Sequence, residues 1–200
     1  MRFSNFMFPA SMDPEKDGQV IDETLREGQL CDQLGMEMLW LAEHHFDGIC
    51  AYVDPVSFAA ALASSTKQIR IGFAVAQMSL HHPIRMAEQM ALIDNISHGR
   101  LVVGLGRGTA YNIYDYQGYG IDPNEAQERL VESEDIMIKA WTTENFAHKG
   151  KFWDIQLDGT SFVTTYGRIG TDGQSSMKEF DSEAKAKKEH DKVVAEKVKK

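Results

Sequence analysis

Side chains capable of acid–base chemistry follow a short apolar run near residue 40. Residues 38–41 read Met-Leu-Trp-Leu, which is typical of a buried strand, and Glu43, His44 and His45 come directly afterwards. In parallel α/β folds the reactive groups lie at the carboxyl ends of strands. Histidine is also the side chain whose ordinary pKa allows proton transfer near neutral pH. The triplet is therefore a candidate acid–base site, although the same histidines would equally suit a surface loop.

Two further segments can contribute to such a site. Residues 104–108 read Gly-Leu-Gly-Arg-Gly after another apolar run, so that a ligand can approach the backbone and Arg107 can pair with a phosphate. No third glycine follows at the offset of the dinucleotide fingerprint, and an ordinary turn from strand to helix explains the run as well. Ala74 and Val75 close a third apolar run, and their small side chains suit either a flat ring or a packed helix.

Apolar periodicity places these segments in a repeated strand–helix order. Strands are predicted at residues 3–8, 38–41, 69–76 and 101–106, and helices at 20–34, from Pro55 onward, at 84–96 and at 124–141; the tyrosine-rich residues 111–119 are predicted as a loop. Four strand–helix units in succession favour a parallel sheet with right-handed crossovers. A closed eight-stranded barrel takes about 250 residues, so the sheet is either open or half of a barrel.

The character of the chain changes near residue 150. Residues 1–150 carry 11 Lys and Arg against 21 Asp and Glu, a balance of −10, whereas residues 151–200 carry 10 against 9. A segment of charge −10 is poorly suited to gripping nucleic acid through its overall field. Residues 151–157 alternate with period two, Asp158-Gly159 predicts a hairpin turn, and strands at 162–166 and 177–180 precede a charged helix. We therefore expect two domains, residues 1–150 and 151–200, the second a small β-meander plus helix.

Several classes of protein are disfavoured by composition. The two cysteines, Cys31 and Cys50, form no CxxC pair, and the seven histidines show no zinc-ligand spacing. No apolar run approaches the roughly 18 residues of a membrane span. The first residues lack the apolar core of a secretory signal. We expect a cytoplasmic protein with reduced thiols, without a metal site and without a membrane partner.

Four segments, taken in order, resemble the bacterial luciferase-like family of flavin-dependent monooxygenases. They are residues 40–46, 70–76, 82–85 and 97–108, and the likeness extends from residue 1 to about 152. The resemblance implies a partial TIM-type (β/α) barrel of about four βα units within the α/β class. It implies monooxygenation of a small-molecule substrate by O2 and reduced flavin that a flavin reductase or another source supplies. FMN is the expected cofactor, with a deazaflavin as the alternative.

The same resemblance assigns roles to single residues. His44 matches the first histidine of the family's Glu-His-His pattern and would be the catalytic base, while Arg107 would reach the flavin phosphate. Glu43, Ala74–Val75 and Gly106 would border the cofactor, and Ala74–Val75 matches a position where the family often has a cis peptide that does not involve proline. Gly106 stands where some luciferases carry a reactive cysteine, which argues against light emission.

Residues 151–200 resemble a different family, the WGR-type domain of some DNA-dependent poly(ADP-ribose) polymerases and bacterial regulators. Residues 152–155, 166–174 and 180–182 carry this likeness, and Tyr166 stands where the namesake tryptophan usually does. The resemblance implies that Tyr166 stacks on a nucleotide and that Arg168 contacts phosphate, with Gly167 between them. The domain is partial, since its usual first strand has no evident counterpart.

We interpret the chain as a chimera of two family fragments that meet near residues 151–153. The leading functional hypothesis is a truncated and impaired flavin-dependent oxidoreductase; the alternative is a nucleic-acid-binding module that uses Tyr166, Gly167 and Arg168. A half barrel exposes two sheet edges and an apolar face. Pairing of two copies into a homodimer would cover them.

Overall fold

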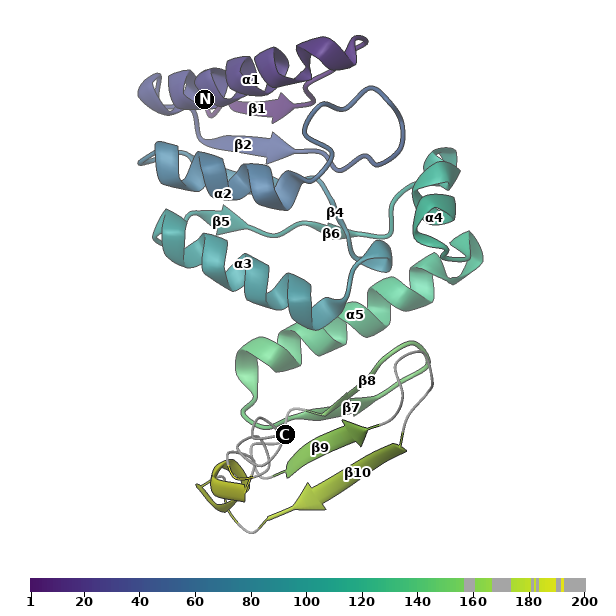
Figure 1. The fold of residues 1–200 in the computed structure, drawn as a ribbon. Coiled ribbons are helices and arrows are strands. Elements are labelled where there is room, and N and C mark those ends of the chain that lie inside the picture. Colours follow the sequence, from purple (N-terminus) through teal and green to yellow (C-terminus); the bar gives the residue numbers. More distant parts are fainter. Residues whose placement is uncertain (157–160, 167–173, 181, 183, 190–191, 193–200) are drawn as a thin grey trace. The chain divides into compact units, whose positions relative to one another are not determined.

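The computed structural model describes residues 1–156, 161–166, 174–180, 182, 184–189 and 192, with the backbone alone at residues 110, 156, 161–166 and 174–179. The chain divides into two compact units, Met1–Thr142 and Thr143–Lys200 (Figure 1). No helix among the described residues is both long enough and apolar enough to cross a membrane.

The first unit alternates strands and helices. In chain order it contains β1 (Ser4–Met7), α1 (Asp17–Gln33), β2 (Met38–Leu41), α2 (Pro55–Ser65), β3 (Arg70–Phe73), β4 (Ala76–Gln77), α3 (Pro83–Ser97), β5 (Leu101–Val102), β6 (Leu105–Gly106), α4 (Ile113–Tyr119) and α5 (Ala126–Thr142). β1, β2, β3 and β5 form one sheet in that order, and every pairing in it is parallel. β4 pairs with β6, also in parallel. The predicted α/β class and parallel sheet are confirmed.

Three of the predicted elements differ in detail. The third and fourth strands are each divided in two, at residues 74–75 and 103–104. The tyrosine-rich segment expected to be a loop is a 3-10 turn, Ala110–Asn112, followed by α4. That prediction was wrong because tertiary packing forms a helix here: Asp115 and Tyr116 face the protein and are 0% and 1% exposed, while Tyr119, one turn from Tyr116, is 44% exposed. Gly120, at a φ of 67°, ends the helix in the left-handed conformation.

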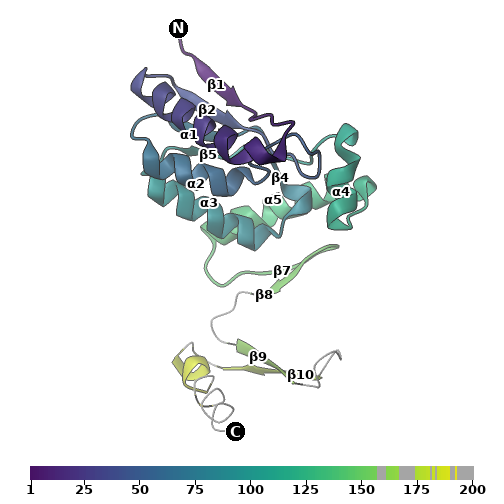
Figure 2. The same cartoon turned by 45° about the horizontal axis from the view of Figure 1, so that its top comes forward.

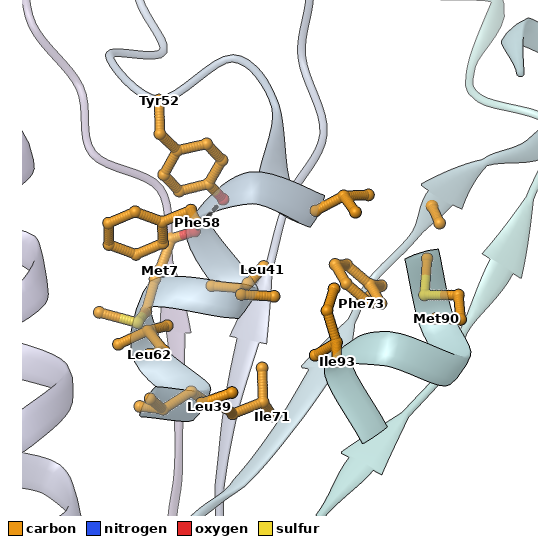
Figure 3. Close-up of a cluster of buried hydrophobic side chains, with 14 of the residues drawn as sticks. Met7, Leu39, Leu41, Tyr52, Phe58, Leu62, Ile71, Phe73, Met90 and Ile93 are labelled. Carbon is orange, nitrogen blue, oxygen red and sulfur yellow. Dashed lines mark hydrogen bonds between the residues drawn. The ribbon is translucent and has the colours of Figure 1, made fainter. Parts of the chain in front are cut away.

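The core lies between the sheet and helices α1, α2 and α3, which pack on one of its faces (Figures 1 and 2). Leu39, Leu41, Ile71 and Phe73 point toward these helices and are fully buried. Figure 3 shows them meeting Leu62 of α2 and Met90 and Ile93 of α3. The Tyr52 hydroxyl joins the same cluster by donating to the Met7 and Ala42 carbonyls at 3.1 and 2.7 Å.

The opposite face of the sheet carries a row of residues in register. Phe6, Trp40, Gly72 and Val102 lie side by side across the four strands. A Cβ on Gly72 would lie 2.7 Å from the Trp40 ring, so the ring occupies the space above that glycine. Phe6, on the edge strand, is 57% exposed. This inner face is the side that lies inside a closed barrel.

The second unit is built from antiparallel strands. β7 (Ala147–Lys149) pairs with β8 (Asp154–Gln156), and β9 (Ser161–Tyr166) pairs with β10 (Gln174–Glu179). Residues 184–189 are helical. β7 was not predicted because three residues, Ala-His-Lys, are too few to show a period, and the expected boundary near residue 150 falls inside the β7–β8 hairpin. The predicted turns at Asp158-Gly159 and at residues 170–173 lie outside the described residues.

Asp32 fixes the start of β3 from the end of α1. Its carboxylate accepts hydrogen bonds from the backbone N–H groups of Lys67, Gln68 and Ile69 at 2.9, 2.8 and 2.7 Å. Burial acts to raise the pKa of Asp32, but these three hydrogen bonds and the charge of Arg100 outweigh it and lower the pKa. The turn that delivers β3 to the sheet is therefore held by the ionised Asp32, together with Arg100, whose guanidinium donates to the Ala63, Thr66 and Ile69 carbonyls.

We expect Asp32→Asn to reduce the free energy of unfolding by about 2 kcal/mol, because an amide has a single acceptor oxygen for three N–H donors. Urea unfolding at neutral pH, followed by circular dichroism, measures the change. Asp22→Asn, at an exposed position of the same helix, is the matched control and should leave stability unchanged. Equal stability of the two variants would contradict this account of the turn.

Candidate functional site

The candidate site lies at the carboxyl ends of the parallel strands. Glu43, His44 and His45 follow β2, Gln77 ends β4, and Arg107 follows β6. Since β1, β2, β3 and β5 run in one direction, and β4 and β6 run parallel to each other, their carboxyl ends meet at one edge. Backbone bonds from Ala74 N–H to the Leu41 carbonyl and from Ala76 N–H to the Gly104 carbonyl, both 2.8 Å, hold the three strand ends together.

Glu43 is the centre of a buried hydrogen-bond network. Its side chain is inaccessible to solvent, and its Oε1 accepts hydrogen bonds from Nε2 of His45 at 2.7 Å and from Nε2 of His81 at 2.5 Å. Its Oε2 accepts from the backbone N–H of Gln77 at 2.7 Å. One carboxylate thus connects the loop after β2, the end of β4 and the segment that leads into α3.

The electrostatics of the network keep Glu43 ionised. Burial alone would raise the pKa of Glu43, but the hydrogen bonds from His45, His81 and the Gln77 backbone, with the charge of His81, outweigh burial and lower it to about 2. For His45, burial acts to lower the pKa, while the hydrogen bond and charge of Glu43 and the charge of Asp115 raise it. The pair therefore favours a carboxylate beside an imidazolium.

A second buried carboxylate, Asp115 of α4, supports the same loop. It is fully buried, and it accepts hydrogen bonds from the backbone N–H of His45 at 3.0 Å and from Nε2 of Gln77 at 3.2 Å. Gln77 also donates to the Glu43 carbonyl at 2.8 Å. The Tyr119 hydroxyl lies 3.3 Å from Nδ1 of His45. Helix α4 thereby fixes the backbone that carries the two histidines.

His44 differs from its neighbour in being accessible. Its side chain is 30% exposed, with the Phe8 ring edge-on at 4.9 Å between centroids. Its Nδ1 lies 3.1 Å from Nδ2 of Asn112 and 3.9 Å from Oδ2 of Asp47. Within the described part of the chain, its Nε2 has no hydrogen-bond partner. His44 thus offers one ring nitrogen to an incoming molecule, whereas His45 is committed to Glu43.

The peptide bond between Ala74 and Val75 is cis, as expected for this position. Ala74 is exposed and Val75 is half-buried. A Cβ placed on Gly106 would overlap the Val75 side chain. Gly106 is therefore required by the close approach of β4 and β6, and a cysteine at this position would displace Val75.

Arg107 follows β6 and is exposed. Its carbonyl accepts a hydrogen bond from the Tyr116 hydroxyl, and five residues later Asn112 contacts His44. Gly108 has a φ of 79°, and a Cβ there would overlap the Gln77 side chain. The segment from Arg107 to Asn112 thus passes over the end of β4 and reaches His44, so its backbone lies at the same edge of the sheet as His44.

The predicted nucleotide-binding residues belong to the second unit. Tyr166 is the last residue of β9. Gly167 and Arg168 lie outside the described residues, so their predicted roles stay predictions.

The network also has the composition of a metal site. Glu43, His45 and His81 each offer one ligand atom, and these atoms lie within 4.8 Å of one another. Two imidazoles and a carboxylate are ligands that divalent zinc and iron use in proteins. Both imidazoles here donate to the same carboxylate oxygen, so a metal ion would have to replace those two protons. The arrangement is a hydrogen-bond network in which the Glu43 carboxylate has three donors, while the buried Oε1 of Gln77 accepts no hydrogen bond from the described residues.

Sequence reasoning missed four residues of the site. Gln77, His81, Asn112 and Asp115 were assigned no role, although each touches Glu43, His44 or His45. For the last two a signal existed, because residues 112, 115, 116 and 119 recur at helical spacing. For His81 the only signal was its place before Pro83, at the start of a helix.

Comparison with known proteins identifies the class. Residues 1–168 match the family model of the luciferase-like monooxygenases, and residues 137–200 match that of the WGR domain. The chain belongs to the luciferase-like monooxygenase family. Its parallel α/β unit corresponds to part of the TIM-type barrel of the matched monooxygenases.

Individual relatives agree with this assignment. The chain is 33% identical over 154 residues to the oxygenase component of the flavin-dependent trigonelline monooxygenase of Acinetobacter baylyi, an alignment that covers 76% of this chain and 42% of the relative. Monooxygenase RslO1 of Streptomyces bottropensis superposes with a TM-score of 0.74 at 30% identity, covering 79% and 48% of the two chains. The oxygenating constituent of 3,6-diketocamphane monooxygenase of Pseudomonas putida, solved with FMN, gives a TM-score of 0.71 at 25% identity, covering 78% and 43%. The chain thus spans about half the length of these relatives.

The lowered pKa of Glu43 predicts an acid limb in stability. Because the folded pKa is about 2 against an ordinary value of 4.5, the ionised carboxylate contributes about 3 kcal/mol above pH 4.5, and this is lost as the pH falls toward 2. His45 has the opposite sign, since its raised pKa stabilises the fold below its ordinary value of 6.5 and the contribution is lost at higher pH.

Glu43→Gln should lower the free energy of unfolding at pH 6. It should also weaken both pH dependences, the loss of stability at acidic pH and the loss above pH 6.5, in urea unfolding measured across pH. Glu88→Gln, at an exposed position of α3, is the control. Parallel pH curves for wild type and Glu43→Gln would refute the assignment.

Proposed function

We propose that the first unit binds a flavin and contributes the acid–base side of a monooxygenase reaction, with His44 as the catalytic base. The observation that supports the proposal is that a partly exposed imidazole, a small apolar strand end and an exposed arginine all follow strands whose carboxyl ends lie at one edge of the sheet. Membership of the luciferase-like family supports the same chemistry. We further propose a cytoplasmic location, a small-molecule substrate, O2 and an external supply of reduced flavin.

The residues around the mouth fit a flavin. Ala74 is exposed and Val75 half-buried, so they offer a flat apolar surface to a ring. Arg107 is exposed, and within the described residues no ion pair is formed by its guanidinium, which is therefore available to a phosphate. The Glu43 carboxylate is buried and already bonded, so its proposed part is to hold His45 and His81 in place. FMN is the proposed cofactor because its phosphate matches Arg107, and a deazaflavin with a phosphate would satisfy the same contact.

When bound, the reduced flavin supplies the electrons that activate O2. The chain's own part is to move a proton at Nε2 of His44. An amide can present either oxygen or nitrogen to Nδ1. If Asn112 accepts from Nδ1–H, then Nε2 carries a lone pair and acts as the base; if Asn112 donates to Nδ1, then Nε2 carries the proton and acts as the acid. Asn112 is therefore a positioning residue, and Phe8 excludes water from one side of the ring.

One variant should lose flavin binding, and another should lose turnover while it still binds flavin. Arg107→Ala should weaken FMN binding at least tenfold and leave riboflavin binding unchanged, since riboflavin has no phosphate for a guanidinium to pair with. His44→Asn should retain FMN affinity but reduce oxygenation at least 100-fold, the size expected for loss of general acid–base catalysis. Flavin fluorescence quenching measures binding, and O2 consumption with chemically reduced FMN and a decanal probe measures turnover.

The matched control for Arg107 is Arg70→Ala, an exposed arginine at the opposite, amino end of β3. It should bind FMN as wild type does. An absence of FMN binding by the wild type, or equal losses in the two arginine variants, would defeat the proposal.

We propose a second function for the second unit, binding of nucleic-acid ends. The match of residues 137–200 to the WGR domain supports it, with Tyr166 stacking on a nucleotide and the segment Gly167-Arg168 on its phosphate.

This second function predicts that DNA affinity depends on Arg168. Arg168→Ala should weaken binding of a nicked duplex and reduce the slope of log affinity against log salt by about 1, because one phosphate contact is lost. Fluorescence anisotropy over a salt series provides the measurement. Lys187→Ala, at an exposed helical position of the same unit, should change the affinity little. A salt-independent signal, or none, would rule the function out.

A further inference from the structure

We propose that two copies of this chain pair through β1 and β5 and close one eight-stranded barrel about a twofold axis. The inference rests on the fold of the first unit and requires no flavin, so it stands or fails separately from the proposed function. Its starting point is the sheet itself. Four strands are half of the eight that close a TIM-type barrel, and β4 and β6 continue β3 and β5 instead of adding strands.

The two edges of the sheet are built for pairing. Within the described residues β1 and β5 each have one neighbour, β2 and β3 respectively. Proteins usually protect an exposed edge with charged side chains, proline or a bulge. β1 reads Ser-Asn-Phe-Met and β5 reads Leu-Val, so neither contains a charge or a proline. The acidic side chains that give residues 1–150 a net charge of −10 are therefore absent from the two edge strands that would meet.

Direction decides which edges can meet. All strands of the sheet are parallel, so a copy turned by 180° about the barrel axis keeps the same strand direction and places its β1 beside β5 and its β5 beside β1. A contact of β1 with β1 across a twofold axis would instead be antiparallel and would leave both β5 edges open. The half-barrel geometry thus selects the pairing of unlike edges, formed twice in one closed dimer.

Side chains on both faces fit this pairing. On the inner face Phe6 is 57% exposed at one edge, and Val102 is half-buried at the other. On the helix-facing side a pocket of about 370 Å³ lies beside β5, and its lining is mixed: the apolar Leu101, Val103, Met90 and Trp141 stand with the polar Asp94 and Asn95 of α3. A strand added to β5 would cover the β5 side of this pocket, whereas Met7 of β1 is already buried in the core of its own unit.

The pairing would also complete the candidate site. The strand ends that carry His44 and Arg107 border one half of a barrel mouth. The strand ends of the second copy would border the other half and bring a second His44 and Arg107 to the same opening. The proposed partner is therefore a contributor to the site.

Analytical ultracentrifugation of the full chain without flavin tests the proposal. We expect a dimer with no higher assemblies. Phe6→Lys should weaken it at least tenfold, because a charge enters the paired apolar face. Leu92→Lys, an equally exposed position on α3, is the matched control and should dimerise as wild type does. A monomer at all concentrations, open-ended oligomers, or equal effects of the two lysines would overturn the proposal.

Cross-linking decides the pairing even if Phe6→Lys fails to fold. Phe6→Cys is combined in turn with a cysteine at His98, Val102 or Gly106, because an eight-stranded barrel of shear 8 displaces the second copy by about four residues along the strands. One of these double variants should give a covalent dimer with a short bis-maleimide, since Cys31 and Cys50 are buried. The single variants should not, because the twofold axis keeps like edges on opposite sides of the barrel. Efficient cross-linking of Phe6→Cys alone, or none with any double variant, would show that unlike edges do not meet.

Discussion

A carboxylate can be buried with its charge only where enough donors meet it, and Glu43 satisfies this requirement by bringing three segments to one point. His45 comes from its own loop, the Gln77 N–H from the end of β4, and His81 from the turn before α3. None of these contacts can be lost without leaving a buried charge short of a partner. The end of β2 and the end of β4 are therefore fixed relative to each other more firmly than two short strands would achieve alone.

This fixed point gives the two adjacent histidines different chemistry. His45 is bonded through Nε2 to Glu43 and held through its backbone by Asp115, so its ring is part of the support. The next residue along a loop points elsewhere, and His44 is left partly exposed with Asn112 at one nitrogen. The ring of His44 is thus accessible, while the hydrogen bonds of His45 hold the loop that carries both residues. Support of this kind places a catalytic side chain without occupying it.

The parts of the site that could be predicted are those on strands. The apolar run of β2 ended at Glu43, and parallel order alone placed Arg107 at the same edge, because such positions follow from a two-residue period and the direction of the chain. Gln77, His81 and Asp115 could not be found in that way. Their contacts depend on the divided third strand, on a 3-10 turn at Met78–Leu80 that precedes His81, and on the short helix α4. Each of these is decided by tertiary packing more than by local pattern. Gly106 was visible as a glycine, but its reason, the Val75 side chain, was not.

The inner face of the sheet shows how four strands can stay correctly paired with one another while the two edge strands can still accept a further strand. Trp40 lies over Gly72, so the middle of the face is covered by the chain's own ring. The large apolar group left in that row is Phe6 at the edge, and burying one such side chain contributes only about 1.5–3 kcal/mol. Contacts between consecutive βα units therefore hold the four strands together, while the drive to add a neighbour is modest and concentrated at the edges. A single edge contact would therefore contribute little to the free energy of association. In a closed pair two such contacts form together, so their contributions combine and favour the closed dimer over one open contact.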